Sequence, residues 1–543
     1  MTTREGMATS NNDLFLRVWP EVSISKVSFC TQPGETPSAR WYPYNKGGEF
    51  RRWYGNNVFV VDWEHDGVRI RNSIDTATGR IRSHNYNGDY AFRPGITWSA
   101  IASGNFACRK TGVGFLFDSK GAKGFVDDID FYLALLNSLT TRKFLDVLAP
   151  TLDYKVGDII EIPVPSIQDK NIVRTIAVRC ESLAKTDWDS YETSWDFQEN
   201  SLVAEARHFG EIMLSDIYDV VRINWAKATV QMRELEIQNN EIFIKAYGLE
   251  GELSPDVPWN EVSLTCNPWY RYGREVPENV DSGSYGVVSE MPMDAGLEKH
   301  LRADTAKELI SYAVGCMMGR YSLDKPGLVL ADAGGTIEDY HAKLREAGVD
   351  VPRFDPDEDG ILPILDADWF EDDIVTRFHA FLRAAFGEAS FHANANWLEE
   401  MLDKDLRTYF VKDFYADHLQ RYQNRPIYWL FSSKKGKFQA LVYLHRYRPD
   451  TPGRVLGYLR SYIAKVTARI EALDRVAADP SAPRSAQTAA LREKTKLVKA
   501  QAELADYERD VLYPLSTERP ALDLDDGVKA NYPKLGAALR KIF

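Results

Sequence analysis

The sequence predicts an α+β protein in which a β-rich region precedes helical and mixed α/β regions and a helical hairpin ends the chain. Three observations lead to this prediction. Short alternating segments with turn residues between them occupy residues 1–130, and apolar residues recur at helical spacing after Ser201. Matching heptads flank a single turn between residues 454 and 512. With 543 residues, the chain has room for roughly two to four domains.

The first predicted domain, residues 1–165, is β-rich. NVFVVDW (57–63) alternates and runs through a turn at His65-Asp66-Gly67 into VRIRN (68–72), which predicts a β-hairpin. Further strands are expected at 95–101, 105–110 and 113–118, followed by an amphipathic helix at 129–149 and an extended segment at 151–165.

Three further domains are expected after this one. Residues 166–300 read as a helical spacer with a long loop rich in Pro, Gly and Ser after residue 250. Residues 301–450 read as a mixed α/β domain that opens with a helix at 301–321 and contains strands at 426–433 and 438–447. Residues 451–543 read as an antiparallel helical hairpin, with its turn at 478–485, and a C-terminal tail.

The charge of the chain is unevenly distributed. The net charge is −13, which argues against unspecific coating of DNA. Residues 1–165 carry 19 Lys and Arg against 18 Asp and Glu, whereas the remaining residues carry 47 against 61. If any part of the chain touches phosphate, we expect it to be this first third.

The sequence gives no sign of a membrane protein, a metal-binding site or a disulfide framework. No apolar run approaches the length of a membrane span and the N-terminus has no apolar signal region, so a cytoplasmic location without membrane contact is expected. The five cysteines are far apart, and neither CxxC nor HExxH occurs, so no metal site is expected.

The most distinctive segment is RWYPYNKGGEFRRWYGNN (40–57). It interleaves Arg40, Lys46, Arg51 and Arg52 with five Trp and Tyr residues and only one acid. Cations attract phosphate and aromatic faces stack on bases, so the segment suggests contact with nucleic acid. The alternative is a twisted β-hairpin whose Trp and Tyr side chains are core anchors, and composition alone favours that alternative.

Two further basic clusters lie in the same domain. Arg69, Arg71, Arg80 and Arg82 accompany one acid, Asp75. Arg109, Lys110, Lys120 and Lys123 also accompany one acid, Asp118. Three clusters in a domain of balanced charge predict a phosphate-facing edge, and the alternative is an ordinary solvated surface. The predicted DNA-binding residues are therefore Arg40, Lys46, Arg51, Arg52, Arg69, Arg71, Arg80, Arg82, Arg109, Lys110, Lys120 and Lys123.

Two motifs match known functional sites in part, but each lacks residues that the complete site requires. The acidic stretch that begins at Asp355 starts like an EF-hand loop, but Pro363 is at position nine and Asp366 replaces the usual Glu at position twelve. An acidic turn is expected instead. Asn267-Pro268-Trp269-Tyr270 is similar to the loop with which amino-methyltransferases hold a flipped base, but no glycine-rich cofactor turn precedes it. It is interpreted as structural, and no catalytic residue is expected.

Several long segments match one family in order along the chain. They are NNDLFLRVW (11–19), RWYPYNKGGEFRRWYGNN (40–57), FRPGITWS (92–99), GFLFDSKGAKGF (114–125), LLNS (135–138), DWDSYETSWDF (187–197), TCNPWYRYG (265–273), ELISYAVGCMMGRYSLD (308–324), FEDDIV (370–375), KDFYADH (412–418), RPIYWLFSS (425–433) and LDLDDGVKANY (522–532). The chain thereby resembles the C-terminal half of PglX-type adenine-specific DNA methyltransferases of BREX phage-defence systems. The related methyltransferase of DISARM systems is equally similar.

The resemblance carries expectations about function. GITWS, LLNS and VGDIIEIPVP (156–165) are similar to target-recognition domains of type IIL restriction–modification enzymes, which read base edges in duplex DNA. The family also has an N-terminal methylase domain that uses S-adenosylmethionine, and the chain is expected to begin after it.

The resemblance therefore implies the DNA-recognition part of an N6-adenine methyltransferase, with no cofactor of its own. The implied partners are double-stranded DNA, a methyltransferase domain in cis or trans, and other defence-system proteins. Whether the chain itself is an enzyme stays open. The alternative is a non-catalytic protein-interaction scaffold.

Overall fold

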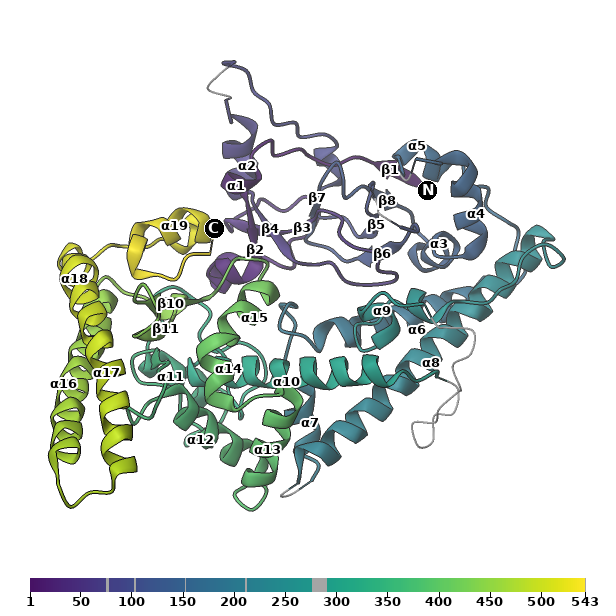
Figure 1. The fold of residues 1–543 in the computed structure, drawn as a ribbon. Coiled ribbons are helices and arrows are strands. Elements are labelled where there is room, and N and C mark those ends of the chain that lie inside the picture. Colours follow the sequence, from purple (N-terminus) through teal and green to yellow (C-terminus); the bar gives the residue numbers. More distant parts are fainter. Residues whose placement is uncertain (75–77, 102–103, 152, 210–211, 276–290, 543) are drawn as a thin grey trace. The chain divides into compact units, whose positions relative to one another are not determined.

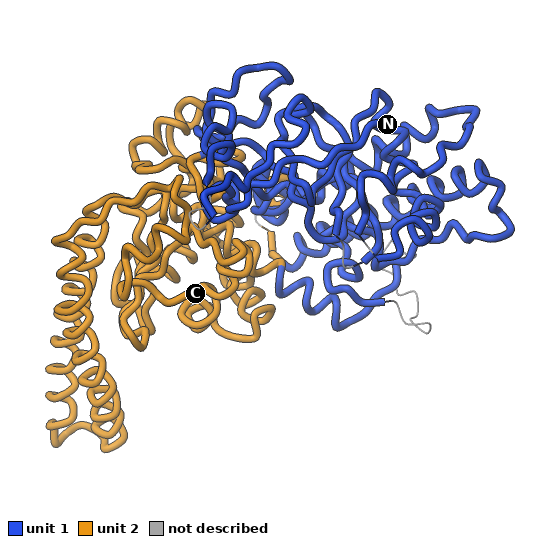
Figure 2. Tube along the Cα trace, turned by 90° about the horizontal axis from the view of Figure 1, so that it is seen from above, with its two compact units in different colours: residues 1–19, 24–205, 215–304 blue, residues 20–23, 206–214, 305–543 orange. Residues whose placement is uncertain are grey.

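A computed structural model describes residues 1–74, 78–101, 104–151, 153–209, 212–275 and 291–542 (Figure 1). The chain forms two compact units (Figure 2). Unit 1 comprises residues 1–19, 24–205 and 215–304, and unit 2 comprises residues 20–23, 206–214 and 305–543. The predicted α+β class is confirmed, because three small sheets occur among many helices. The four predicted domain boundaries are finer than this division and stay predictions.

Unit 1 contains two four-stranded sheets. The first has the order β1 (Thr2–Arg4), β8 (Lys123–Phe125), β5 (Gly95–Trp98), β6 (Cys108–Thr111), and all its neighbours are antiparallel. The second has the order β2 (Leu16–Val18), β4 (Phe59–Asp62), β3 (Trp41–Asn45), β7 (Leu116–Phe117), with β7 parallel to β3. Aromatic side chains of the segment 40–57 form part of the core, since Trp41, Tyr42, Tyr44 and Trp53 are all buried.

The helices of unit 1 pack mainly beside the first sheet. They are α1 (Asn12–Phe15), α2 (Glu64–Arg71), α3 (Ile129–Leu136), α4 (Leu139–Leu148), α5 (Val156–Ile160), α6 (Lys170–Asp189), α7 (Ser201–Ala206), α8 (Leu214–Tyr247) and α9 (Pro268–Arg271). One apolar cluster joins Ile96 and Trp98 of β5 to Phe131 of α3, Val173 of α6 and Phe243 of α8. The predicted helical character of the spacer is thus confirmed by α6, α7 and α8.

Unit 2 is built on a small antiparallel sheet of β10 (Tyr428–Ser432), β11 (Gln439–Tyr443) and β9 (Ile361–Pro363). The strands at 426–433 and 438–447 are therefore confirmed. The helices that end in this unit or lie within it are α10 (Ala295–Met317), α11 (Ile337–Glu346), α12 (Ile374–Phe386), α13 (Phe391–Leu402), α14 (Leu406–Lys412), α15 (Phe414–Arg421), α16 (Thr451–Ala478), α17 (Arg484–Tyr507), α18 (Tyr513–Glu518) and α19 (Val528–Leu535).

The predicted helical hairpin is confirmed by α16 and α17, which lie side by side (Figure 1). Leu459 and Val466 of α16 and Leu504 of α17 are fully buried between them and the sheet. Arg469 and Glu493 form an ion pair of 2.8 Å across the two helices. Heptad spacing on both sides of one turn is enough to produce this element because its core contacts are local in sequence.

The predicted hairpin of residues 57–72 is wrong. β4 forms as expected, but the first four residues of VRIRN belong to α2 and do not pair with β4. His65, Asp66 and Gly67 all have positive φ, between 51° and 70°, and redirect the chain into helical turns. A Cβ at Gly67 would lie 2.4 Å from the Trp63 ring, so this turn requires glycine.

Two other elements differ from prediction. The single helix expected at 129–149 is two helices, α3 and α4, because the Ser138 side chain accepts a hydrogen bond from the Thr141 N–H and starts a new helix. The segment expected to be extended after residue 151 contains α5, which Asp158 caps by accepting from the Lys155 N–H.

Candidate nucleic-acid interface

Arg51, the first of the paired arginines in the segment 40–57, lies in the interior of unit 1. Its side chain is 4% exposed and forms a 2.6 Å ion pair with Asp187 of α6, which is 4% exposed as well. The guanidinium also donates to the Thr265 hydroxyl at 2.9 Å and stacks over the Trp188 ring. Burial opposes the charge, but Asp187 and other neighbours together outweigh it, and the pKa of Arg51 is raised.

Arg52 and Trp53 bind the adjacent helix. Arg52 forms ion pairs with Glu236 of α8 at 3.0 Å and with Glu261 at 2.9 Å. The Trp53 indole N–H donates to the other oxygen of Glu236 at 2.7 Å. Arg51, Arg52 and Trp53, which we call the RRW anchor, therefore attach the β-rich part of unit 1 to its helices.

Two more cations of the predicted set are buried in unit 1. Arg109 of β6 is 2% exposed and donates to the Arg51 carbonyl, and burial lowers its pKa to about 10. Lys123 of β8 is fully buried near the rings of Phe115 and Phe125, and burial lowers its pKa to about 7. The structure thus places Arg51, Arg52, Arg109 and Lys123 away from solvent, which removes them from an exposed phosphate-facing edge.

Three cations of the set are partly exposed and paired. Arg40 contacts Asp62 at 3.3 Å, and Lys46 contacts Asp118 at 2.7 Å. Lys110 bridges Asp130 and Glu181 at 2.9 and 2.7 Å. To contact phosphate, Arg40, Lys46 and Lys110 would have to leave their protein carboxylates or share them with the phosphate. The net electrostatic free energy gained on binding DNA would therefore be smaller.

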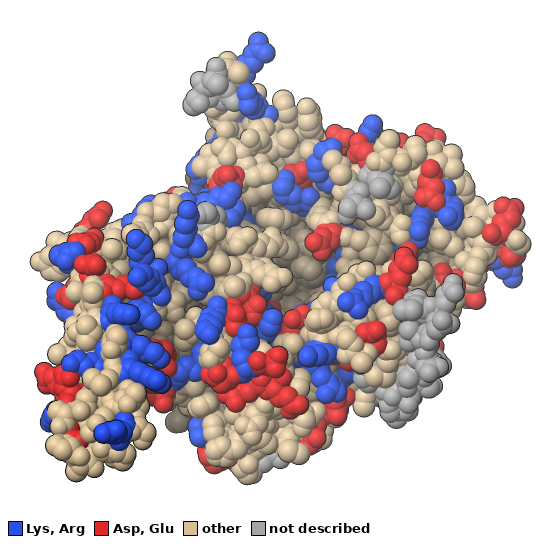
Figure 3. Space-filling view, viewed as in Figure 1, with Lys and Arg blue, Asp and Glu red and all other residues tan. Residues whose placement is uncertain are grey.

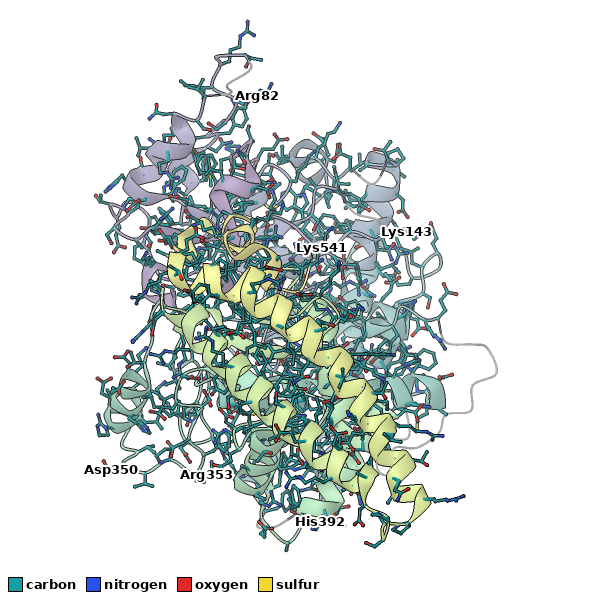
Figure 4. The ribbon with its side chains drawn as sticks, turned by 60° about the vertical axis from the view of Figure 1, so that its left-hand side comes forward. Arg82, Lys143, Asp350, Arg353, His392 and Lys541 are labelled. Carbon is teal, nitrogen blue, oxygen red and sulfur yellow. The ribbon has the colours of Figure 1, made fainter. Side chains whose placement is uncertain are left out.

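The remaining five cations are exposed or largely so: Arg69, Arg71, Arg80, Arg82 and Lys120. The four arginines lie on residues 68–74 and 78–84, which we call the arm. Figure 3 shows Lys and Arg on this projecting segment at the top of the view, and Figure 4 labels Arg82 on it. The described residues of the arm contain no carboxylate, and Asp75 lies outside the described residues.

The base of the arm is tied to the second sheet of unit 1. Arg69 pairs with Asp62 at the end of β4, and Arg71 pairs with Asp66 at 2.6 Å. Arg80 and Arg82 lie farther along, where both side chains are exposed. The sequence analysis treated the four arginines as one cluster, and the structure places them on one segment. The element that carries Arg69 and Arg71 is the helix α2, whereas a strand was predicted.

The partners of the RRW anchor were missed by sequence reasoning. Asp187, Glu236 and Glu261 lie more than 130 residues after it in the chain. One signal was present: Glu236 follows Met232 by four residues and therefore shares its core-facing side of α8. A carboxylate at such a position needs a buried cation.

The two rejected motifs have structural roles. Asn267 is fully buried, caps α9 by accepting from the Trp269 N–H, and donates to the Val262 carbonyl at 2.9 Å. In the acidic stretch, a single oxygen of Asp357 accepts the N–H groups of Asp359, Gly360 and Ile361. Burial first, and then Asp357, raise the pKa of Asp359 to about 8.

The described residues lack both a metal-binding cluster and a membrane-spanning helix. These residues contain no group of three His, Cys, Asp or Glu side chains placed to hold a metal ion. Within the same ranges, no helix has the length and apolar character that crossing a bilayer requires.

Comparison with known proteins gives similarity to two named methyltransferases. The chain is 36% identical to the adenine-specific methyltransferase PglX of Lacticaseibacillus casei, over 99% of the chain and 42% of that protein. It is 34% identical to the adenine-specific methyltransferase BrxX of Escherichia coli, over 99% of the chain and 43% of that protein. No protein-family model matches. The chain spans less than half the length of these relatives, and it is homologous over nearly all of its own length to one part of adenine-specific methyltransferases of the PglX and BrxX kind.

Proposed function

We propose that this chain is the DNA-recognising part of an N6-adenine DNA methyltransferase of BREX-type phage defence. The observation that carries the proposal is the similarity of 99% of the chain to only 42–43% of two adenine-specific methyltransferases. A segment of that extent, without the motifs that bind S-adenosylmethionine, suits the task of positioning DNA for a methylase domain in cis or trans.

The arm is the proposed contact surface. Its four arginines are exposed and lie in the first third of the chain, where Lys and Arg nearly balance Asp and Glu. Exposed arginines neutralise phosphates and bind guanine edges through two hydrogen bonds. We therefore assign DNA contact to Arg69, Arg71, Arg80, Arg82 and Lys120, with Arg40, Lys46 and Lys110 at the margin. The four buried cations hold the sheets in place instead.

Salt-dependent binding tests this proposal. Fluorescence anisotropy of the purified chain with a labelled duplex should show log K falling with log salt concentration, by about 0.9 per neutralised phosphate. The pair Arg80→Ala/Arg82→Ala should reduce that slope by roughly 1–2. The matched control is Arg484→Ala/Arg492→Ala, which removes two exposed arginines of α17. Absence of binding at low salt, or a slope near zero, would refute the proposal.

S-adenosylmethionine is proposed to bind outside this chain. Titration calorimetry of the purified chain with the cofactor should give no heat of binding, and the chain alone should not methylate plasmid DNA. Binding of the cofactor to the chain would show that the division of labour proposed here is incorrect.

A protein-interaction scaffold is the second candidate. Leu491 and Val498 are 52% and 45% exposed and, seven residues apart, share one face of α17. Such a face suits another helix of a defence-system protein. Leu491→Lys/Val498→Lys should abolish co-purification with that protein and leave DNA affinity unchanged. Unchanged co-purification would remove this candidate.

A further inference from the structure

The exposed side of α17 carries a heptad pattern of its own. Thr488, Leu491, Thr495, Val498 and Ala502 follow one another at alternating spacings of three and four residues, and all five are exposed. Residues at these spacings line one side of a helix. α17 therefore presents to solvent a continuous strip of about 21 Å, which we call the outer seam.

The outer seam offers apolar groups to a partner. Leu491 and Val498 are 52% and 45% exposed. The hydroxyls of Thr488 and Thr495 donate to the carbonyls of Arg484 and Leu491, each at 2.8 Å, so the hydroxyls are satisfied within α17 and the methyl groups remain for a partner. Small and aliphatic side chains at the a and d positions of a heptad form the surface on which a second helix packs.

One border of the outer seam is basic. Arg492 and Lys499 directly follow the two aliphatic seam residues, which puts both cations at the e position that flanks a coiled-coil seam. Both side chains are exposed, and no carboxylate of the described residues pairs with either. Glu493, the one acid in the sequence from 484 to 502, forms an ion pair with Arg469 of α16 at 2.8 Å. A partner helix would therefore meet positive charge at this border.

The turn between β10 and β11 adds three lysines on the same side of α17. Glu503 follows Lys499 by one helical turn, and its carboxylate accepts the Lys435 N–H at 2.7 Å. Lys434, Lys435 and Lys437 of this turn are all exposed. Residues 451–543 carry 16 Lys and Arg against 12 Asp and Glu, although the whole chain has a net charge of −13. Figure 3 shows Lys and Arg side chains over the α16–α17 hairpin, at the left of the view.

Charge and apolar surface together decide which partner fits. A nucleic-acid backbone would use the cations but leave Leu491 and Val498 without an apolar contact. A second copy of the chain would bring two basic borders together across a self-complementary interface, which like charges oppose. An amphipathic helix with acidic borders matches both features of the outer seam.

We propose that α17 pairs through the outer seam with an acidic amphipathic helix of a partner protein. Apolar side chains of that helix would pack on Leu491 and Val498, and its Asp or Glu side chains would pair with Arg492 and Lys499. At the other border Lys494 already pairs with Asp474 of α16, so the basic border selects the charge of the partner. This inference rests on the second candidate function, the interaction scaffold, and states the chemistry of its partner.

Two synthetic helical peptides test the chemistry of the partner. Both have three heptads with Leu at a and d, and one carries Glu at e and g whereas the other carries Lys. Fluorescence anisotropy of each labelled peptide with the full chain at pH 7 should show that the Glu peptide binds at least about tenfold more tightly. Circular dichroism should show that the Glu peptide gains helix when the chain is added.

Charge reversal at the basic border should reverse this preference. Arg492→Glu/Lys499→Glu should weaken binding of the Glu peptide about tenfold and strengthen binding of the Lys peptide, because attractive pairs become repulsive ones. The matched control is Arg475→Glu/Lys541→Glu, which changes the net charge equally at exposed positions outside α17. It should leave both affinities unchanged.

The apolar part of the outer seam is tested separately. Leu491→Asn/Val498→Asn should weaken the Glu peptide more than about tenfold, because two aliphatic side chains would no longer be buried on binding. Val476→Asn, at a position of α16 that is 40% exposed, should have no effect. Far-ultraviolet circular dichroism of each variant should match the wild type, because all the replaced side chains are exposed.

The outcomes separate this inference from the proposed functions. Equal binding of the two peptides, or no binding of the Glu peptide, would overturn it. If co-purification with a partner is nevertheless lost in Leu491→Lys/Val498→Lys, the scaffold candidate stands and only the acidic chemistry is wrong. Weaker binding of duplex DNA by Arg492→Glu/Lys499→Glu, with unchanged binding of the Glu peptide, would make the border a phosphate contact. A dimer of the chain that Leu491→Asn/Val498→Asn abolishes would make the outer seam a self-association surface, and both of these results would also overturn the inference.

Discussion

Arg51→Met is the sharpest test of the structural role of the RRW anchor. The substitution keeps an unbranched apolar side chain and removes the guanidinium, which pairs with Asp187 at 2.6 Å while both side chains are 4% exposed. The carboxylate left behind would still accept the N–H groups of Thr265 and Cys266, at 2.7 and 2.9 Å. It would have lost the cation with which it forms this buried ion pair.

The expected cost follows from that loss. Removing one partner of a buried ion pair destabilises a protein by about 3–5 kcal/mol, because the other charge stays desolvated. Asp187→Ala should cost more, since it also leaves the Thr265 and Cys266 N–H groups unpaired, and each buried unpaired N–H adds about 1–3 kcal/mol. The structure therefore predicts an order as well as a size.

Chemical denaturation followed by tryptophan fluorescence measures both variants. Arg71→Met is the matched control, because Arg71 and Asp66 are 42% and 55% exposed, and an exposed pair contributes about 0–1 kcal/mol. A loss below about 1 kcal/mol for Arg51→Met, equal to that of Arg71→Met, would refute the reasoning. So would full stability accompanied by weakened DNA binding, because Arg51 would then face DNA as its sequence context suggests.

Three other predictions concern single side chains. Lys123→Met should remove a rise of stability with pH: burial lowers the pKa of Lys123 to about 7, while the unfolded chain keeps a value of about 10.4. Between those values the unfolded state binds the extra proton, so the wild-type urea midpoint should increase from pH 7 to pH 9 and that of the variant should not. Leu504→Ala should destabilise the helical hairpin by about 2–5 kcal/mol in thermal or urea unfolding, whereas Leu491→Ala, at an exposed position of the same helix, should change stability by less than about 0.5 kcal/mol. Ellman's reagent should modify Cys30 rapidly and Cys108, Cys180, Cys266 and Cys316 only on unfolding, because Cys30 is exposed and the other four are buried; a second fast thiol would contradict this arrangement.

The parts of the fold that the sequence predicted are those whose contacts are local. The hairpin of α16 and α17 follows from heptads around one turn, and β10 and β11 follow from two alternating segments with a short connection. VRIRN failed because alternation over five residues fits a strand equally well, and the three positive-φ residues before it are set by Trp63 packing on Gly67. A side-chain contact of that kind leaves no periodic signal.

The predicted DNA-binding residues show why local amino-acid composition is a poor guide to whether a Lys or Arg side chain is exposed or buried. Lys and Arg are rarely buried unless paired, so a cluster with few nearby acids reads as exposed. That inference counts acids along the chain, whereas the carboxylates that neutralise Arg51 and Arg52 are supplied by α6, by α8 and by the loop around Glu261. The neighbouring aromatic residues do not show whether the cations are exposed or buried either. A Trp that stacks on a base and a Trp that fills a core can have the same sequence neighbours.

The helices that supply the carboxylate partners contain a signal that distinguishes buried from exposed arginines. Asp187 and Glu236 occupy buried positions of amphipathic helices, where a carboxylate is costly unless a cation reaches it. Two such positions require two buried cations, and the RRW anchor supplies them. At the base of the arm, Arg69 and Arg71 pair with Asp62 and Asp66. Electrostatic demand therefore assigns Arg51 and Arg52 to the interior, whereas Arg80 and Arg82 are exposed on the arm, where we propose that DNA binds.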